Sequence, residues 1–163
     1  MQQAPIYPGE DKRLEAVHGL KLLDTEPEER FDHITKEAQQ RFNVPISTIT
    51  LIDKDREWFK SCQGVDVREA PRNISFCGHA MFAKEVFVVE DTLNDERFKD
   101  NPSVTGAPYI RFYAGVALHD RNTGLPVGVF CIKDTKPRSM NAGDVATLLE
   151  LASRAEREIN IAV

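Results

Sequence analysis

Two residues close together in the sequence, Cys77 and His79, have side chains that could do chemistry. A thiolate and an imidazole near a helix amino terminus can form a nucleophile with its base, or two ligands of a metal ion. Ser75 is expected to cap a short helix here, and side chains two positions apart on a helix point in different directions. We therefore interpret Cys77 as a small buried side chain and His79 as a hydrogen-bonding helix residue, and we assign no metal site. A reactive Cys77 is the alternative.

Arg111 and Tyr113 are the pair that we favour for contact with a ligand. Alternation puts both on one face of an expected strand together with Gly115, which leaves room beside the sheet. A guanidinium fork matches a carboxylate or phosphate, and a phenol adds stacking area and a hydrogen bond. An anionic small molecule would fit such a site. The alternative is that Arg111 pairs with Asp91 or Asp95 and ties a long loop to the sheet.

Aromatic side chains are expected to form the apolar walls of the same cavity, as is usual in pockets for small ligands. These side chains are Trp58, Phe76, Phe98 and Tyr109. Core packing explains them equally well. Asn101 is expected to cap or turn the backbone before Pro102, and it is a further candidate for ligand contact.

The composition limits the classes of protein to which the chain can belong. It has 163 residues, of which 41% are hydrophobic and 29% are charged, and its net charge is −5. This size suits one globular domain. Because no basic stripe could neutralise a series of phosphates, we expect no nucleic-acid partner. No apolar run approaches the roughly 20 residues of a membrane span, so we expect no membrane partner either.

The cysteines and the first residues indicate a compartment. Cys62, Cys77 and Cys131 are an odd number with no C-x-x-C spacing, which suits free thiols in a reducing environment better than a disulfide framework. Residues 1–10 lack the basic region and apolar stretch of a secretory signal. We therefore expect a cytoplasmic protein.

The elements that must position these residues follow from the periodicity of apolar side chains. Residues 1–9 contain two prolines and a glycine, typical of a flexible leader, and residues 10–163 are expected to form a single domain. The periodicity predicts helices over 11–23, 27–42, 76–83 and 142–163 and strands over 46–53, 58–63, 86–90, 111–119 and 127–132.

Strands joined by short turns predict hairpins, so we expect an α+β fold with a central antiparallel sheet. The terminal helices would cover one face, and the short helix and the long loop of residues 91–110 would cover a pocket on the other. The last helix carries an apolar stripe with near-heptad spacing: Val145, Leu149, Ala152, Ile159 and Ala162. The stripe either only covers the sheet or also supports dimerisation.

This order of elements, together with several short motifs, resembles a GAF domain. The motifs are Leu22-Leu23-Asp24-Thr25, Phe31-Asp32, Ser75-Phe76-Cys77-Gly78-His79-Ala80, Asn101-Pro102 and Arg111-Phe112-Tyr113-Ala114-Gly115. The likeness covers nearly the whole chain and is closest to GAF domains at the amino terminus of bacterial signalling proteins, where such a domain often precedes a histidine kinase or a diguanylate cyclase. It implies a sheet of five to six strands, a homodimer through the terminal helices, and a last helix that continues into a signalling coil.

The resemblance also implies a function. A GAF domain of this group is expected to bind a small molecule and to transmit ligand or redox state through its terminal helices to a kinase or diguanylate cyclase in a longer chain. The family binds varied ligands, so no cofactor is assigned.

Two alternatives stay open: a ligand-free dimerisation module, and a thiol-dependent enzyme similar to the GAF-type reductases of free methionine sulfoxide. That reaction needs a reactive cysteine in the loop of residues 91–110, which has none. Bilin attachment needs a cysteine directly followed by histidine, from which Cys77-Gly78-His79 departs. We therefore expect no enzymatic activity.

Overall fold

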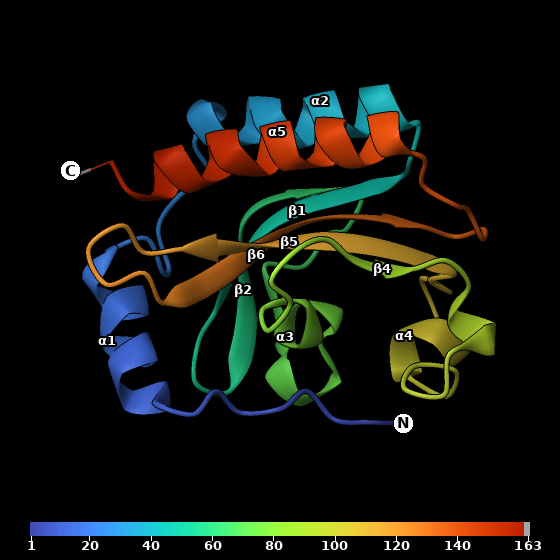
Figure 1. Ribbon diagram of the computed structural model, residues 1–163, viewed down its shortest axis with the longest axis horizontal. Coiled ribbons are helices and arrows are strands. Elements are labelled where there is room, and N and C mark those ends of the chain that lie inside the picture. The colour runs from blue at the N-terminus through green and yellow to red at the C-terminus, as the bar shows by residue number, and fades with distance from the viewer. Residues whose placement is uncertain (162–163) are drawn as a thin grey trace.

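The centre of the molecule is one six-stranded antiparallel sheet with the order β3-β2-β1-β6-β5-β4 (Figure 1). A computed structural model describes residues 1–161. The strands are β1 (Ile46–Ile52), β2 (Arg56–Gln63), β3 (Glu69–Pro71), β4 (Phe87–Val89), β5 (Phe112–His119) and β6 (Pro126–Asp134). The predicted α+β fold with an antiparallel sheet is confirmed. The apolar periodicity did not predict β3.

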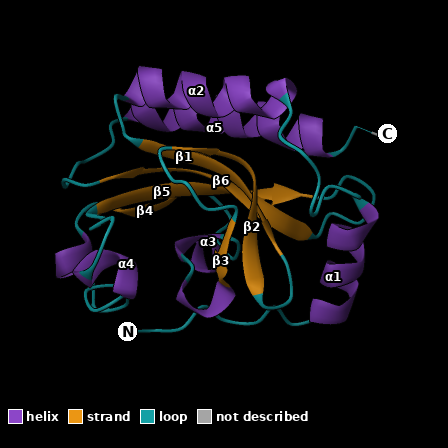
Figure 2. Ribbon diagram, turned by 180° about the vertical axis from the view of Figure 1, so that it is seen from behind, coloured by secondary structure: helices purple, strands orange, loops and turns teal. Residues whose placement is uncertain are grey.

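Two long helices, α2 (Glu29–Phe42) and α5 (Ala142–Ile159), lie side by side on one face of the sheet (Figures 1 and 2). An Asn141–Asp144 capping box satisfies backbone donors at the start of α5. Leu149, which we assigned to the apolar stripe of α5, is 44% exposed and faces away from the core. Ala162 lies outside the described residues. Among the described residues, no helix has the length and apolar character that crossing a membrane requires.

The first helix, α1 (Glu10–Gly19), does not join this layer. It packs against β6 at one end of the sheet (Figure 1). It ends at Gly19, four residues before the predicted end, because Lys21 and Asp24 adopt left-handed backbone angles that a helix cannot continue.

Short elements cover the opposite face of the sheet. They are η1 (Arg72–Ile74), α3 (Phe76–Ala80), η2 (Thr92–Asn94) and α4 (Pro102–Thr105). The Ser75 side chain caps α3 by accepting a hydrogen bond from the Gly78 backbone N–H, as the sequence predicts. The long loop of residues 91–110 contains α4 at Pro102–Thr105. It also contains the helical turn expected around residues 97–99, where the Lys99 backbone N–H donates to the Asp95 carbonyl at 2.9 Å.

The sheet separates two cores. The core on the α2 and α5 side contains Phe31, Leu51, Phe130 and Leu148. The core on the α3 side contains the Phe76 and Phe98 rings together with Cys77, Tyr113 and Cys131. The candidate site residues are divided between these two cores.

Residues 1–9 run along the outside of α3 (Figure 2). The Ala4 backbone N–H donates to the Asn73 carbonyl at 3.1 Å, and the Tyr7 ring lies 5.8 Å from that of Phe82. A side chain at Gly78 would come within 2.7 Å of the Ala4 Cβ. The segment that we expected to be a loose leader therefore forms the outer cover of α3.

Candidate functional site

Four of the predicted site residues meet beneath α3. The Phe76 ring stacks on those of Phe98 and Tyr113, with centroids 4.4 and 5.2 Å away, and the His79 imidazole meets the Phe98 ring edge-on at 4.9 Å. The α3 helix supplies two of these side chains, and the long loop and β5 supply the others. The sequence thus predicted which aromatic groups cluster on this face, apart from two exceptions described below.

Tyr113 occupies the space that we had expected to hold a ligand. Its side chain is fully buried, and its hydroxyl donates a hydrogen bond to the Cys77 sulfur at 3.1 Å. A Cβ at Gly115 would lie 2.5 Å from the Tyr113 hydroxyl oxygen. The glycine therefore makes room for the tyrosine ring rather than for a bound group. Burial raises the pKa of Tyr113 well above its usual value, which keeps the hydroxyl protonated.

Cys77 and His79 point in different directions, as their spacing predicts. The Cys77 sulfur faces the sheet, 3.9 Å from the Thr50 hydroxyl, whereas the His79 Nε2 lies 3.1 Å from the Gln2 carbonyl oxygen. Burial raises the pKa of Cys77 and lowers the pKa of His79. The two side chains therefore do not form a nucleophile–base pair.

Arg111 ties the long loop to the sheet through backbone carbonyls. One of its guanidinium nitrogens donates to the carbonyls of Val104 and Ile110, at 2.9 and 3.1 Å. The expected partners Asp91 and Asp95 are engaged elsewhere, within their own turns. The alternative that Arg111 ties the long loop to the sheet is therefore correct, but its partners are backbone carbonyls and not Asp91 or Asp95.

Asn101 joins the long loop to the segment before α3. Its Oδ1 accepts from the Ser103 backbone N–H at 2.9 Å and so caps α4, as expected. Its amide nitrogen donates to the Ile74 carbonyl at 3.0 Å. With 1% of its surface exposed, Asn101 has a structural role in this conformation.

Two of the expected cavity walls lie elsewhere. Trp58 is buried on the opposite face of the sheet, in the core that contains Leu51, its neighbour on β1. A register shift between Ile49 and Thr50 changes the pairing of β1 with β2, so counting from the flanking residues does not give the face. Tyr109 is 53% exposed. The prediction that these two side chains line the cavity is wrong.

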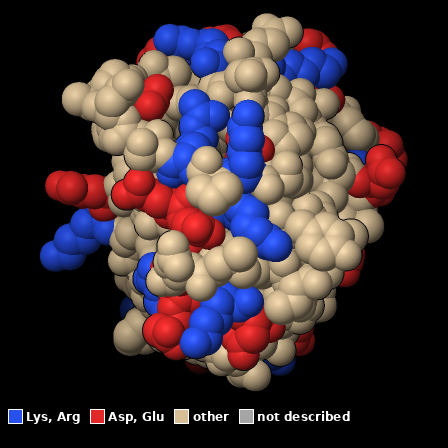
Figure 3. Space-filling view, turned by 90° about the vertical axis from the view of Figure 1, so that its right-hand side faces the viewer, with Lys and Arg blue, Asp and Glu red and all other residues tan. Residues whose placement is uncertain are grey.

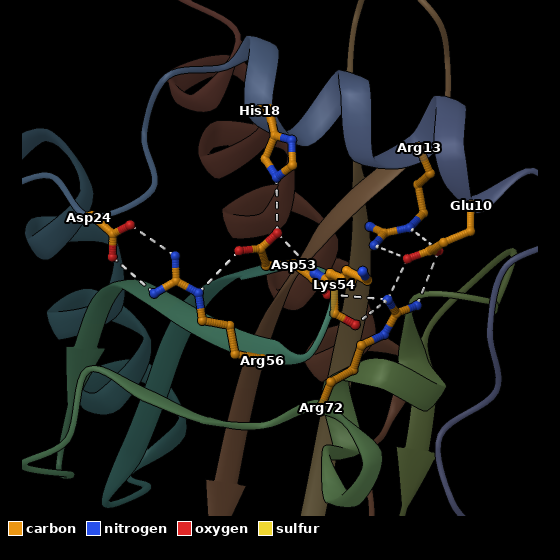
Figure 4. Close-up of polar contacts among 8 residues, drawn as sticks. All are labelled: Glu10, Arg13, His18, Asp24, Asp53, Lys54, Arg56 and Arg72. Atoms are coloured by element: carbon orange, nitrogen blue, oxygen red, sulfur yellow. Dashed lines mark hydrogen bonds and ion pairs between the residues drawn. The ribbon is translucent and has the colours of Figure 1, made fainter.

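A group of charged side chains that was not predicted from the sequence joins η1, the segment before α3, to α1 (Figure 4). Glu10 bridges Arg13 of the same helix and Arg72 of η1, and the two arginines are 0% and 3% exposed. Burial alone would raise the pKa of Glu10, but the two guanidinium groups lower it from 4.5 to about 2. We call Glu10, Arg13 and Arg72 the Glu10 clamp.

The Glu10 clamp continues into the turn between β1 and β2. Arg72 donates to the carbonyls of Asp53 and Lys54, at 3.2 and 3.3 Å. The Asp53 carboxylate lies 3.0 Å from the His18 Nε2 and accepts from the Arg56 Nε at 3.1 Å (Figure 4). Only the three-residue spacing of Glu10 and Arg13 could have indicated part of this network, since the other partners are distant in sequence.

At the other end of α3, a second contact reaches α1. The Arg13 guanidinium lies 3.5 Å from the sulfur of Met81, the residue that follows α3. Side chains of α1 thus touch both the segment before α3 and the residue after it. Within residues 1–161, no group of three or more His, Cys, Asp or Glu side chains is placed to hold a metal ion.

The model of the GAF domain family matches residues 26–159. The chain belongs to the GAF family. Over 151 residues it is 40% identical to a cyclic di-GMP phosphodiesterase of Pseudomonas aeruginosa, covering 92% of this chain and 26% of that protein. The GAF domain described here therefore spans about a quarter of the length of this curated relative.

Solved structures share the fold at low sequence identity. The GAF domain of a phosphoenolpyruvate-protein phosphotransferase from Coxiella burnetii is 12% identical with a TM-score of 0.67, covering 90% of this chain and 92% of that one. A domain of a two-component sensor histidine kinase protein from Sinorhizobium meliloti is 18% identical, with a TM-score of 0.61 and coverage of 83% and 92%. Free methionine-R-sulfoxide reductase from Neisseria meningitidis is 17% identical, with a TM-score of 0.64 and coverage of 98% of both chains.

Proposed function

We propose that this GAF domain is the regulatory module of a cyclic di-GMP signalling protein, with α3 and the long loop as its input face. The observation that carries the proposal is the 40% identity to a GAF-containing region of a cyclic di-GMP phosphodiesterase. The domain itself does no catalysis in this proposal. Its state changes the activity of an output domain in a longer chain.

The Glu10 clamp supports a route from the input face to the amino-terminal helix. Arg72 stands before α3 and Met81 follows it, and both contact side chains of α1. The buried charges hold these segments in one arrangement, because separating a guanidinium from its carboxylate in a buried site is costly. A shift of α3 therefore moves α1.

The carboxy-terminal helix is joined to α2 by charged contacts. The Arg30 guanidinium donates to the Glu158 carbonyl at 2.7 Å, near the end of α5, and Arg154 pairs with Glu37 at 3.0 Å. These contacts support a layer of α2 and α5 that moves as a unit. The exposed Leu149 on α5 is a contact point for the homodimer that we propose for this layer.

Arg111 remains the candidate for an anionic signal. Its side chain lies at the edge of the input face, and one of its nitrogens makes all of its contacts to backbone carbonyls. On the side of the molecule seen in Figure 3, Lys and Arg side chains form a short band with Asp and Glu around it. Such a surface suits a compact anion better than a polyanion.

A second candidate function is a ligand-free dimerisation module. The packing of Phe76, Phe98 and Tyr113 beneath α3 favours it, because side chains fill the expected ligand space in this conformation. A ligand would then have to displace the tyrosine ring. The two candidates differ in whether any change on the α3 face alters the output.

The test replaces the matching region of the Pseudomonas phosphodiesterase with this chain and measures hydrolysis of cyclic di-GMP. Glu10→Asp keeps the charge of the clamp but shortens its reach. Glu26→Asp makes the same chemical change at an exposed side chain that lies outside both the clamp and the input face. We expect the first variant to change turnover by about fivefold or more, a typical coupling between sites, and the second to leave it unchanged.

Melting curves of the parent chimera and of both variants must first show that each protein is folded. Equal turnover in the parent chimera and in both variants would overturn the proposed regulatory route. An active chimera that responds to no change on the α3 face would favour the dimerisation module instead.

A further inference from the structure

Two of the three cysteines meet beneath α3. Cys77 comes from α3 and Cys131 from the central strand β6, and their sulfur atoms are 3.9 Å apart. Both side chains are fully buried. The third thiol, that of Cys62, is oriented toward the Val65 carbonyl at 3.6 Å. The tertiary fold thus brings together two thiols that are 54 positions apart in the sequence.

Polar side chains surround this pair, although its site is buried. The Tyr113 hydroxyl donates to the Cys77 sulfur, and the Thr48 hydroxyl lies 3.0 Å from the Cys131 sulfur and 2.8 Å from the Thr50 hydroxyl. Hydrocarbon side chains would fill the same volume without needing partners. Hydroxyl groups instead fix the position of both sulfur atoms and can solvate a developing thiolate.

The two thiols differ in acidity. Burial raises the pKa of Cys77 well above its usual value. Burial also opposes ionisation of Cys131, but the Cys77 thiol, the Lys133 ammonium and the Thr48 hydroxyl favour the thiolate and lower the pKa of Cys131 to about 7. Cys131 is therefore the better nucleophile, and Cys77 stays a thiol that can react in a second step.

We propose that Cys77 and Cys131 are a peroxide-oxidisable pair that closes to a reversible disulfide between α3 and β6. The Cys131 thiolate attacks one oxygen of hydrogen peroxide, and with one proton this gives a sulfenic acid and water. The Cys77 sulfur then attacks the sulfenic sulfur, and its proton leaves with the hydroxide as a second water. The thiol pair loses two electrons, and the peroxide gains them. A small-molecule thiol reverses the reaction by disulfide exchange.

Closing the bond has a mechanical consequence. The sulfur atoms must approach from 3.9 Å to about 2.05 Å, which draws α3 toward the sheet. Gly78 of α3 packs against Ala4, and the flanking residues Arg72 and Met81 contact α1 side chains. The oxidation would therefore supply an input to the proposed regulatory route, although the bond itself forms independently of any output domain.

Access to the buried pair requires only a local opening. The α3 helix has only five residues and contacts the sheet through side chains, such as the Tyr113 hydroxyl that donates to Cys77. Such short segments open far more often than the whole protein unfolds. Hydrogen peroxide is small enough to enter through an opening of this kind.

The experiment treats the reduced chain with excess hydrogen peroxide, quenches and denatures it, alkylates the remaining thiols and maps them by mass spectrometry. Trypsin releases Cys77 in residues 73–84, Cys131 in residues 122–133 and Cys62 in residues 61–68. We expect the first two peptides to be linked, with the loss of two hydrogens, and only Cys62 of the three cysteines to be alkylated. Dithiothreitol should restore all three thiols.

Variants separate this bond from other oxidation. Cys62→Ser should still form the link, whereas Cys77→Ser should end in a sulfenic or higher acid at Cys131. Lys133→Gln should slow oxidation several-fold at neutral pH, with the exposed Lys136→Gln as its matched control. If a cysteine variant does not fold, the peptide map of the unaltered chain decides.

Full alkylation of Cys77 and Cys131 after peroxide treatment, or a link that contains Cys62 instead, would overturn the proposal. This result would leave the proposed regulatory function standing, because that function is tested by turnover in the chimera. Conversely, unchanged turnover of the Glu10→Asp chimera would not contradict a disulfide that the peptide map shows.

Discussion

The two faces of the sheet differ in the side chains that pack against them. On the side of α2 and α5, large hydrocarbon side chains such as Phe31, Phe130 and Leu148 fill the space and need no partners. On the side of α3, thiols, hydroxyls and one tyrosine are held by hydrogen bonds. Apolar burial stabilises both faces, and on the α3 side hydrogen bonds to the two buried thiols add specific contacts.

Removing volume from the apolar face should give the largest effect. Phe130→Ala deletes a fully buried ring from the core beneath α2 and α5. We expect the free energy of unfolding to fall by about 3–5 kcal/mol, because the transfer free energy is lost and a cavity remains. Urea denaturation measures this loss. Leu93→Ala, at a half-exposed position, is the control and should change little. A loss of less than about 1 kcal/mol for Phe130→Ala would contradict the comparison.

Breaking the Glu10 clamp should cause the second-largest loss in the free energy of unfolding. Glu10→Gln leaves the Arg13 and Arg72 guanidinium groups buried without their counter-charge, which should cost about 3 kcal/mol at neutral pH. The cost should depend on pH. The folded-state pKa of Glu10 is lowered from 4.5 to about 2, so its stabilisation is present above pH 4.5 and is lost as the pH falls toward 2.

The measurement is the unfolding free energy of parent and variant across that pH range. The two curves should converge as the pH falls. Glu96→Gln, on the exposed surface, should follow the parent throughout. A constant offset between parent and Glu10→Gln would show that the clamp does not stabilise the fold by charge.

A small change on the α3 face should lower the free energy of unfolding by less than either of these two substitutions. Tyr113→Phe keeps the stacked ring and removes only the hydroxyl that donates to Cys77. We expect a loss of about 1 kcal/mol, the usual net contribution of one hydrogen bond. Thermal unfolding measures it, with Tyr7→Phe on the amino-terminal segment as the control. A loss as large as that of Phe130→Ala would mean that the two faces do not differ as described.

The smallest effect on stability is expected at Arg111. Arg111→Ala removes two hydrogen bonds to loop carbonyls at a half-buried position and should cost at most about 1 kcal/mol. A thermal-shift screen with nucleotides, amino acids and small carboxylates tests its other role. A ligand at 100 times its dissociation constant adds about 2.7 kcal/mol. Stabilisation of the parent but not of the variant would place Arg111 in a binding site, and no stabilisation by any compound would favour the ligand-free module.

Sequence analysis predicted the elements that are defined by local patterns. The spacing of Phe31 and Ile34 predicted α2, Ser75 predicted the start of α3, and Asn101 was expected to cap or turn the backbone before Pro102, where α4 begins. The opposite orientations of Cys77 and His79 also follow from helix geometry alone. These features depend on residues only a few positions apart.

The features that were missed depend on distant residues or on small irregularities. A register shift in β1 and β2 separates Trp58 from the other aromatic groups. The pairing of Arg72 with Glu10 joins segments 62 positions apart, and the contact between Cys77 and Cys131 joins the short helix on one face of the sheet to a central strand. The periodicity of apolar residues indicates which face of an element a side chain lies on. It does not indicate which side chains from distant segments contact that side chain.

The short outer strands of the sheet affect how easily the domain pairs with strands of neighbouring chains. Both outer strands, Glu69–Pro71 and Phe87–Val89, have only three residues, and Pro71 lacks a backbone donor. Longer bare edges would act as templates for strands of neighbouring chains and promote aggregation. Here the outermost strand on each side offers only three residues to an incoming strand. Neighbouring copies of the domain can therefore lie close together with little opportunity to pair through their outermost strands.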